Sequence, residues 1–179
     1  MSKKGKKSKS NKERKHTVQE LFDALCKIRS EMLNDPVAKD IANELNDDTD
    51  PEDFLKCVPI SFEEMDVSAK TQAGKIQLNY KLIDKPFPIM MRYVMHELTH
   101  AVQHILNDGS MSKDEDEDYL DKESEIEAFQ RQIEYQSNNS SNKDVEKYID
   151  ELLSYHNVPK KEREEKKEEL LELSDATNK

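Results

Sequence analysis

The chain has few cysteines and no long apolar run. Its 179 residues include only two cysteines, Cys26 and Cys57, which stand apart with no Cys-x-x-Cys spacing. Isolated cysteines of this kind do not indicate a disulfide framework or a thiolate zinc site, and they favour a reducing compartment. No stretch is apolar enough for a secretory signal peptide or a membrane span. We therefore expect a cytoplasmic protein that does not contact a membrane.

Charge, by contrast, is abundant and unevenly distributed. Charged residues make up 37% of the sequence and hydrophobic residues 34%, so the core must be compact and part of the chain lies outside it. Residues 1–16 carry eight Lys or Arg and one Glu, a net +7, which leaves −18 on the remainder of a chain whose total is −11. This Lys- and Ser-rich arm is predicted to be a disordered tail, with contact to nucleic acid or another polyanion as an alternative role.

One five-residue motif, His-Glu-x-x-His at positions 96–100, carries the clearest chemical signal. On a helix, residues four apart lie on one face, so the imidazoles of His96 and His100 can bind one zinc ion. Glu97 between them can then act as general base toward a zinc-activated water. The motif predicts metal-assisted hydrolysis. A structural helix with exposed or hydrogen-bonded histidines is the simpler alternative.

The surrounding segment, residues 88–107, has the periodicity of an amphipathic helix. Pro88 suits its first turn, and Gly109 follows its end as a stop signal. With one turn every 3.6 residues, the motif falls on the same arc as Gln103 and His104, opposite an apolar arc. His104 lies one turn further along the axis, where we expect plain exposure, with an indirect role beside the metal or the substrate as the alternative.

A catalytic zinc usually has three protein ligands, so a third residue is required. The metzincin pattern is excluded, because Gln103 and Leu106 stand where that pattern needs Gly and His. A second predicted helix, residues 119–135, offers Glu125 at the margin of its apolar face, whereas Glu127 projects further round toward solvent. Glu125 is therefore the expected third ligand, and Glu127 is the runner-up.

The motif at 96–100, followed by Glu-x-Glu-Ala at 125–128, resembles the gluzincin type of zincin metallopeptidase in a minimal form. It is similar to small zincin domains of the phage-encoded and ImmA/IrrE-like kind, and the resemblance covers roughly positions 58–137. A phage association would place the protein in a host cytoplasm or a virion. Larger gluzincins often carry an aspartate four residues after the third ligand, and here that position is Phe129.

The resemblance implies a zinc metallopeptidase that acts on a peptide or protein substrate. It implies Zn²⁺ ligation by His96, His100 and Glu125, with Glu97 as general base. The donor to the oxyanion stays open among Tyr93, Tyr135, His104 and His156. Two further functions stay open: a non-catalytic zincin-like module that regulates or binds protein or nucleic acid, and a metal-free helical interaction protein with a chance motif.

The predicted fold class is α+β: a mostly helical zincin-like domain with a small antiparallel sheet whose edge strand precedes the motif helix. Strict alternation of apolar and polar residues predicts this strand over 75–83, and 58–65 is a plausible second strand. A capping box at 17–20 and the pair Asp35-Pro36 predict the starts of two helices nearer the N-terminus.

The expected domain organisation has three parts. Residues 1–16 form the basic tail, residues 17–157 form the metallopeptidase domain with its metal core at about 58–137, and residues 158–179 form a charged C-terminal helix or tail. An acidic stretch over 108–118 lacks the spacing of an EF-hand, so we expect a solvated loop there.

Overall fold

The computed structural model describes residues 16–46, 49–109, 120 and 122–174. The predicted basic tail, apart from His16, and most of the predicted acidic loop lie outside these residues. The described elements are, in chain order, α1 (Val18–Asn34), α2 (Pro36–Ala42), α3 (Pro51–Cys57), β1 (Ile60–Glu63), β2 (Ala69–Gln72), β3 (Lys75–Asn79), the 3-10 turn η1 (Tyr80–Leu82), α4 (Phe87–Leu106), α5 (Glu123–Asn139), α6 (Asn142–Tyr155) and α7 (Arg163–Leu173). The mostly helical α+β class is thereby confirmed.

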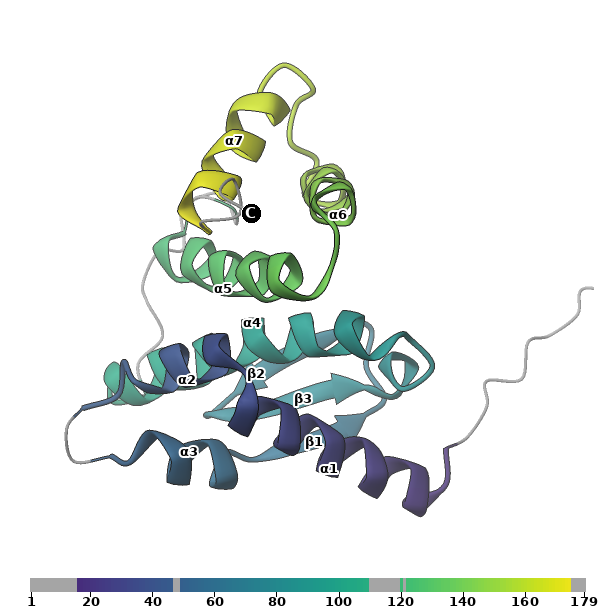
Figure 1. Ribbon diagram of the computed structural model, residues 1–179, viewed down its shortest axis with the longest axis vertical. Helices are drawn as coiled ribbons and strands as arrows, with labels where there is room; N and C mark the ends of the chain where they lie inside the picture. Colours follow the sequence, from purple (N-terminus) through teal and green to yellow (C-terminus); the bar gives the residue numbers. More distant parts are fainter. Residues whose placement is uncertain (1–15, 47–48, 110–119, 121, 175–179) are drawn as a thin grey trace, which may run out of the picture.

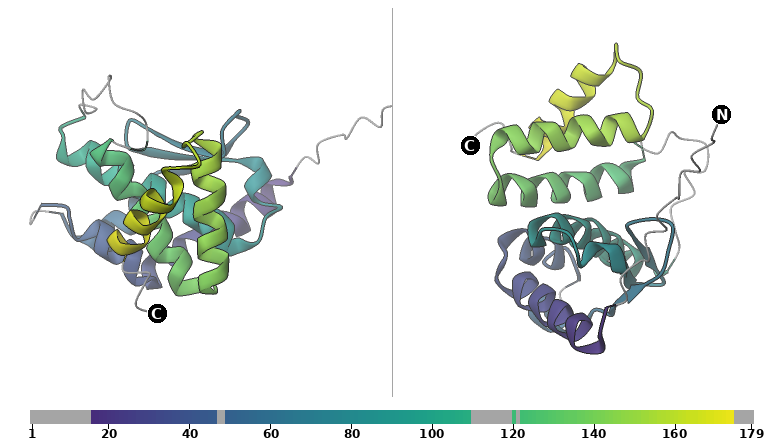
Figure 2. Two further views of the ribbon diagram at one scale, coloured as in Figure 1. Left: turned by 90° about the horizontal axis from the view of Figure 1, so that it is seen from above. Right: turned by 90° about the vertical axis from the view of Figure 1, so that its right-hand side faces the viewer.

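Helix α4 lies in the middle of the molecule. It packs against β2 and β3 on one side and against α5 on the other. Figure 1 shows helices α5, α6 and α7 gathered on one side of α4, and the sheet with α1, α2 and α3 on the other. The right-hand view of Figure 2, turned by 90° about the vertical axis, shows the same arrangement. None of the helices that the structure describes is both long enough and apolar enough to cross a membrane.

The small sheet differs from the predicted one in two respects. Its strand order is β1-β3-β2, with β1 parallel and β2 antiparallel to β3, so the sheet is mixed and not antiparallel. The strand before the motif helix, β3, is therefore the central strand, and β2 is the edge. Both faces of β3 are covered, since Gln77 and Asn79 are only 9% and 6% exposed, and Ile76 and Leu78 have no exposed surface. The polar residues that alternate with apolar ones in this strand therefore do not face solvent, although the alternation predicted that they would.

Strand β2 was not predicted, because its sequence Ala-Lys-Thr-Gln has no apolar run. A tight turn joins it to β3: Ala73 and Gly74 both adopt positive φ, at 51° and 71°. Two successive positive φ angles form the kind of two-residue turn that matches the twist of antiparallel strands. The turn brings a short polar strand to the edge of the sheet, next to α4.

The predicted strand 75–83 is shorter in the structure. Asn79 ends it, because its side chain accepts from the Lys81 backbone N–H at 3.0 Å and donates to the carbonyl oxygens of Met65 and Val67. The chain then turns through η1 into α4. The second predicted strand, within 58–65, is confirmed as β1.

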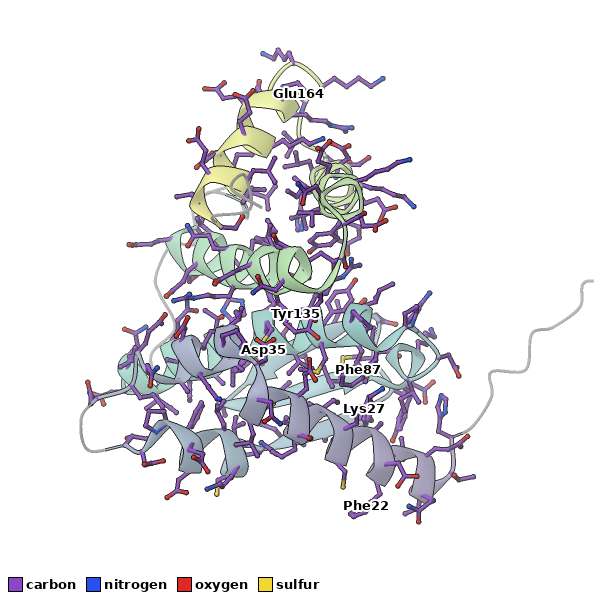
Figure 3. The ribbon with its side chains drawn as sticks, in the orientation of Figure 1. Phe22, Lys27, Asp35, Phe87, Tyr135 and Glu164 are labelled. Carbon is purple, nitrogen blue, oxygen red and sulfur yellow. The ribbon has the colours of Figure 1, made fainter. Side chains whose placement is uncertain are left out.

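Helix starts follow the predicted capping signals. Thr17 and Glu20 form the reciprocal capping box of α1, and the Asp35 side chain accepts from two backbone N–H groups at the start of α2. A cation–π contact also joins α1 to the start of α4. Figure 3 shows Lys27 beside Phe87, and the Lys27 ammonium lies 3.9 Å from the ring centroid of Phe87.

The buried apolar residues form two clusters that meet at α5. The larger cluster joins α1 to α4 and the sheet, and it includes Tyr135 of α5. The smaller joins α5, α6 and α7 around Ile133, Ile149 and Leu153, each with no exposed surface. Leu170 of α7, inside the predicted charged C-terminal segment, is buried in this second cluster.

We expect Ile133→Ala to lower the free energy of unfolding by about 2–5 kcal/mol, because the truncation leaves a cavity in a fully buried site. Urea denaturation followed by circular dichroism measures the loss. Leu173→Ala is the matched control, because Leu173 is 47% exposed. Equal effects of the two substitutions would contradict the second cluster as described.

Candidate metal centre

Helix α4 presents the motif residues between the side that packs against β2 and the side that packs against α5. Its opposite flank is apolar, and residues such as Met95 and Leu98 have no exposed surface. His96 and Glu97 are themselves only 7% and 5% exposed. Buried polar side chains are costly unless they have partners, so their neighbours define what the site can do.

The side chains of His96, His100 and Glu125 converge on one point. The two Nε2 atoms lie 3.1 Å apart. Glu125 Oε2 lies 3.4 Å from Nε2 of His96 and 3.5 Å from Nε2 of His100. The structure thus brings together, from α4 and α5, the three residues that the sequence nominated as ligands, and these three can hold a metal ion.

The donor set and its spacing fit zinc. Two imidazole nitrogens and one carboxylate oxygen are a known catalytic zinc set that leaves a fourth position open. Tetrahedral bonds of about 2.1 Å place neighbouring ligand atoms about 3.4 Å apart. The three separations here are close to that value. In the absence of a cation, the same distance allows one Nε2–H to donate to the other Nε2.

Glu127, the runner-up ligand, has a different partner. Its Oε2 accepts a hydrogen bond from Nε2 of Gln103, at 2.5 Å. Glu127 follows Glu125 by two residues on α5, and residues two apart on a helix do not face the same way. The carboxylate of Glu127 is therefore directed at the Gln103 side chain, and only Glu125 joins the two imidazoles.

Glu97 lies beside this group and is held from β2. The Thr71 hydroxyl donates to the backbone carbonyl oxygen of Glu97 at 2.8 Å. Burial raises the pKa of Glu97 above its ordinary value of 4.5, while the charges of His96 and His100 act in the opposite direction. A raised pKa brings a carboxylate closer to the range in which it exchanges protons near neutral pH.

Two cavities open on either side of the motif. One, of about 670 Å³, lies between β2, the second half of α4 and the start of α5, and it includes Lys70 and His104. The other, of about 480 Å³, lies between the residues leading into β2, the first half of α4, α5 and α6. His96 and Glu97 line both cavities. The motif is thus reachable from two sides along the edge strand.

The structure separates the four candidates for the oxyanion donor. Tyr135 lies elsewhere: its hydroxyl donates to Glu31 of α1 at 3.3 Å, and Figure 3 shows it pointing from α5 toward Asp35. Tyr93 and His156 line the smaller cavity, and His104 lines the larger one. Burial lowers the pKa of His156. Three of the four candidates therefore border the motif.

Phe129 occupies the position where larger gluzincins often have an aspartate. Its ring centroid lies 4.7 Å from that of His96 and 5.9 Å from that of His156. Nδ1 of His96 is buried and has no hydrogen-bond partner among the described residues. The polar contacts of His96 are therefore all made by Nε2, and its ring also packs against that of Phe129.

Sequence reasoning missed the contribution of β2. Thr71, Lys70 and the neighbouring residues lie on a strand with no hydrophobic pattern, so the sequence carried no signal for them. The helical periodicity places Gln103 on the same arc as the motif, but the sequence does not indicate a role for its side chain. Its partners on α5, Ser124 and Glu127, appear only when the two helices are packed.

In comparisons with family models, with curated proteins and with solved structures, nothing matches this chain.

In metal-free protein, we expect the His100 imidazole to keep its proton to a higher pH than an exposed histidine. Burial lowers its pKa, but Glu125 followed by Gln103 and Glu97 raise it more, so the net pKa is above 6.5. The stabilisation that this gives is complete below the unfolded-state pKa and is lost as pH rises through the folded-state pKa. NMR titration of chelator-treated protein measures the value, and Glu125→Gln should lower it. A pKa that does not change in that variant would contradict the contact.

Proposed function

We propose that this protein is a zinc-dependent metallopeptidase, with His96, His100 and Glu125 as zinc ligands and Glu97 as general base. The observation that carries the proposal is the convergence of two imidazole Nε2 atoms and one carboxylate oxygen beside a buried glutamate, between two open cavities. Three protein ligands leave the fourth position that a catalytic zinc requires.

A bound zinc ion would supply two effects, polarisation of the scissile carbonyl and a water pKa lowered toward about 7. Glu97 would take the proton of the attacking water and pass it to the leaving amine, so that water is added across the peptide bond. Its burial and raised pKa support this assignment. Thr71 would keep the backbone of Glu97 against β2 while the side chain exchanges the proton.

The substrate in this proposal is a peptide segment of extended conformation. Strand β2 is the edge of the sheet and pairs with β3 on one side only. An extended segment can add to such an edge through backbone hydrogen bonds. The two cavities would then receive side chains on either side of the scissile bond. We propose the cytoplasm as the compartment, from the two isolated cysteines.

We expect purified protein to hold close to one zinc per chain, measured by elemental analysis after reconstitution and dialysis. His100→Ala and Glu125→Ala should lose this zinc, because each removes one of only three ligands. Glu123→Ala is the control, since Glu123 is exposed in the first turn of the same helix. Absence of zinc from the reconstituted wild-type protein would refute the proposal.

Glu97→Gln should retain zinc but lose turnover by about 10²–10⁴-fold, because an amide cannot accept the proton that a general base must take. The assay is cleavage of a quenched-fluorescence peptide library by zinc-loaded protein, with zinc content measured on the same sample. Wild-type activity in this variant would remove Glu97 from the mechanism. Bound zinc in the wild type with no cleavage of any peptide would favour the non-catalytic zincin-like module.

A further inference from the structure

The side chain of Gln103 connects a proposed zinc ligand to the neighbouring helix. Its Oε1 lies 2.8 Å from Nδ1 of His100, three residues earlier on α4. Its Nε2 donates to the carbonyl oxygen of Ser124 at 3.1 Å and to Oε2 of Glu127. All three partners are within reach of one amide, which lies between α4 and α5.

The orientation of this amide follows from chemistry. A carbonyl oxygen and a carboxylate oxygen only accept hydrogen bonds, so the end of Gln103 that faces Ser124 and Glu127 must be the NH₂ group. The other end is then the amide oxygen, which also only accepts. Nδ1 of His100 must therefore carry the hydrogen, which leaves Nε2 of an uncharged imidazole with the lone pair that a metal needs.

Glu127 is the anchor of this arrangement. Arg131, one turn further along α5, is engaged elsewhere, since it forms ion pairs with Glu44 and Glu134. Besides the Gln103 amide, the carboxylate of Glu127 lies beside that of Glu44, which forms the ion pair with Arg131. By contrast, Nδ1 of His96 has no hydrogen-bond partner among the described residues, so the arrangement serves one of the two imidazoles only.

We infer that Gln103 and Glu127 are positioning residues that hold His100 in its metal-binding tautomer and orientation. The inference rests on the proposed function in one respect, namely that His100 binds zinc. Hydrogen bonds to the free nitrogen of a ligand histidine fix its orientation, and their loss typically weakens metal binding by about 10–100-fold. Here the carboxylate acts through an amide and not directly.

The test compares zinc affinity across a set of variants, by competition with a chromophoric chelator. Gln103→Leu, which removes the amide at similar size, should weaken zinc binding by about 10–100-fold. Glu127→Gln should also weaken it, because the charge that orders the Gln103 amide is removed. Gln72→Leu is the control, since Gln72 lines the same cavity and contacts none of the three ligands.

The double variant Gln103→Glu with Glu127→Gln gives the most discriminating result. It exchanges the amide and the carboxylate, so His100 can still donate to an oxygen at position 103 and the new amide at position 127 can donate to the same group. A carboxylate at position 103 cannot donate to the Ser124 carbonyl oxygen, so we expect zinc affinity below that of wild type but above that of Gln103→Glu alone. Gln103→Glu alone places two carboxylates together and should bind zinc more weakly than the double variant.

The tautomer of His100 is a second measurement, and it would not change if Gln103 and Glu127 only stabilised the fold. In zinc-loaded wild type, long-range ¹H–¹⁵N spectra should show His100 protonated at Nδ1, with a slowly exchanging hydrogen that exchanges faster in Gln103→Leu. Unchanged zinc affinity and exchange in Gln103→Leu and Glu127→Gln, in a wild type that binds zinc, would overturn the inference. A wild type that binds no zinc would instead refute the proposed function. Thermal unfolding of every variant checks that folding is retained.

Discussion

The burial of α4 on two sides is the constraint on which the rest of the structure depends. The helix packs against β2 and β3 on one side and against α5 on the other. Two of its motif residues, His96 and Glu97, are consequently buried too, at 7% and 5% exposed. Unpaired polar groups in such a position would cost several kcal/mol, on the order of 2–7 each. The protein therefore surrounds them with Thr71, Gln103 and Glu125, and the need for partners defines the site.

Helix α5 contacts α4 through some of its residues and the C-terminal helices α6 and α7 through others. Glu125 and Glu127 reach different side chains of α4, and Ala128, which has no exposed surface, lets the two helices lie close together. Ile133 lies in the cluster shared with α6 and α7. The proposed metal centre and the C-terminal helices are thus coupled through one element. Phe129 belongs to both, because it packs in the second cluster and contacts the His96 ring.

The parts of the fold that could be predicted are those with a strong local signal. The α1 capping box, the amphipathic pattern of α4 and the apolar face of α5 each reflect interactions within a few residues of one another, so they can be read from one segment. The sheet could not be predicted in the same way. Strand pairing joins segments that are distant in the sequence. In addition, β2 has a polar sequence with no strand pattern, because one of its edges pairs with β3 and its residues line the larger cavity. The alternation in β3 wrongly indicated an edge strand, because Gln77 and Asn79 are buried by neighbours that the sequence does not reveal.

The sequence by itself determined the chemistry that the site can offer. Two imidazoles four residues apart on one helix must share a face, so the spacing of His96 and His100 already implied a pair of metal-ligating nitrogens, with Glu97 beside them. The position of Glu125 at the margin of the apolar face of its helix favoured it over Glu127, but only the tertiary structure decided what each carboxylate contacts. The packing of α5 on α4 directs Glu125 at the two Nε2 atoms and Glu127 at Gln103. Local geometry sets the direction of a side chain on its own helix, whereas the distance to a partner depends on how two helices pack.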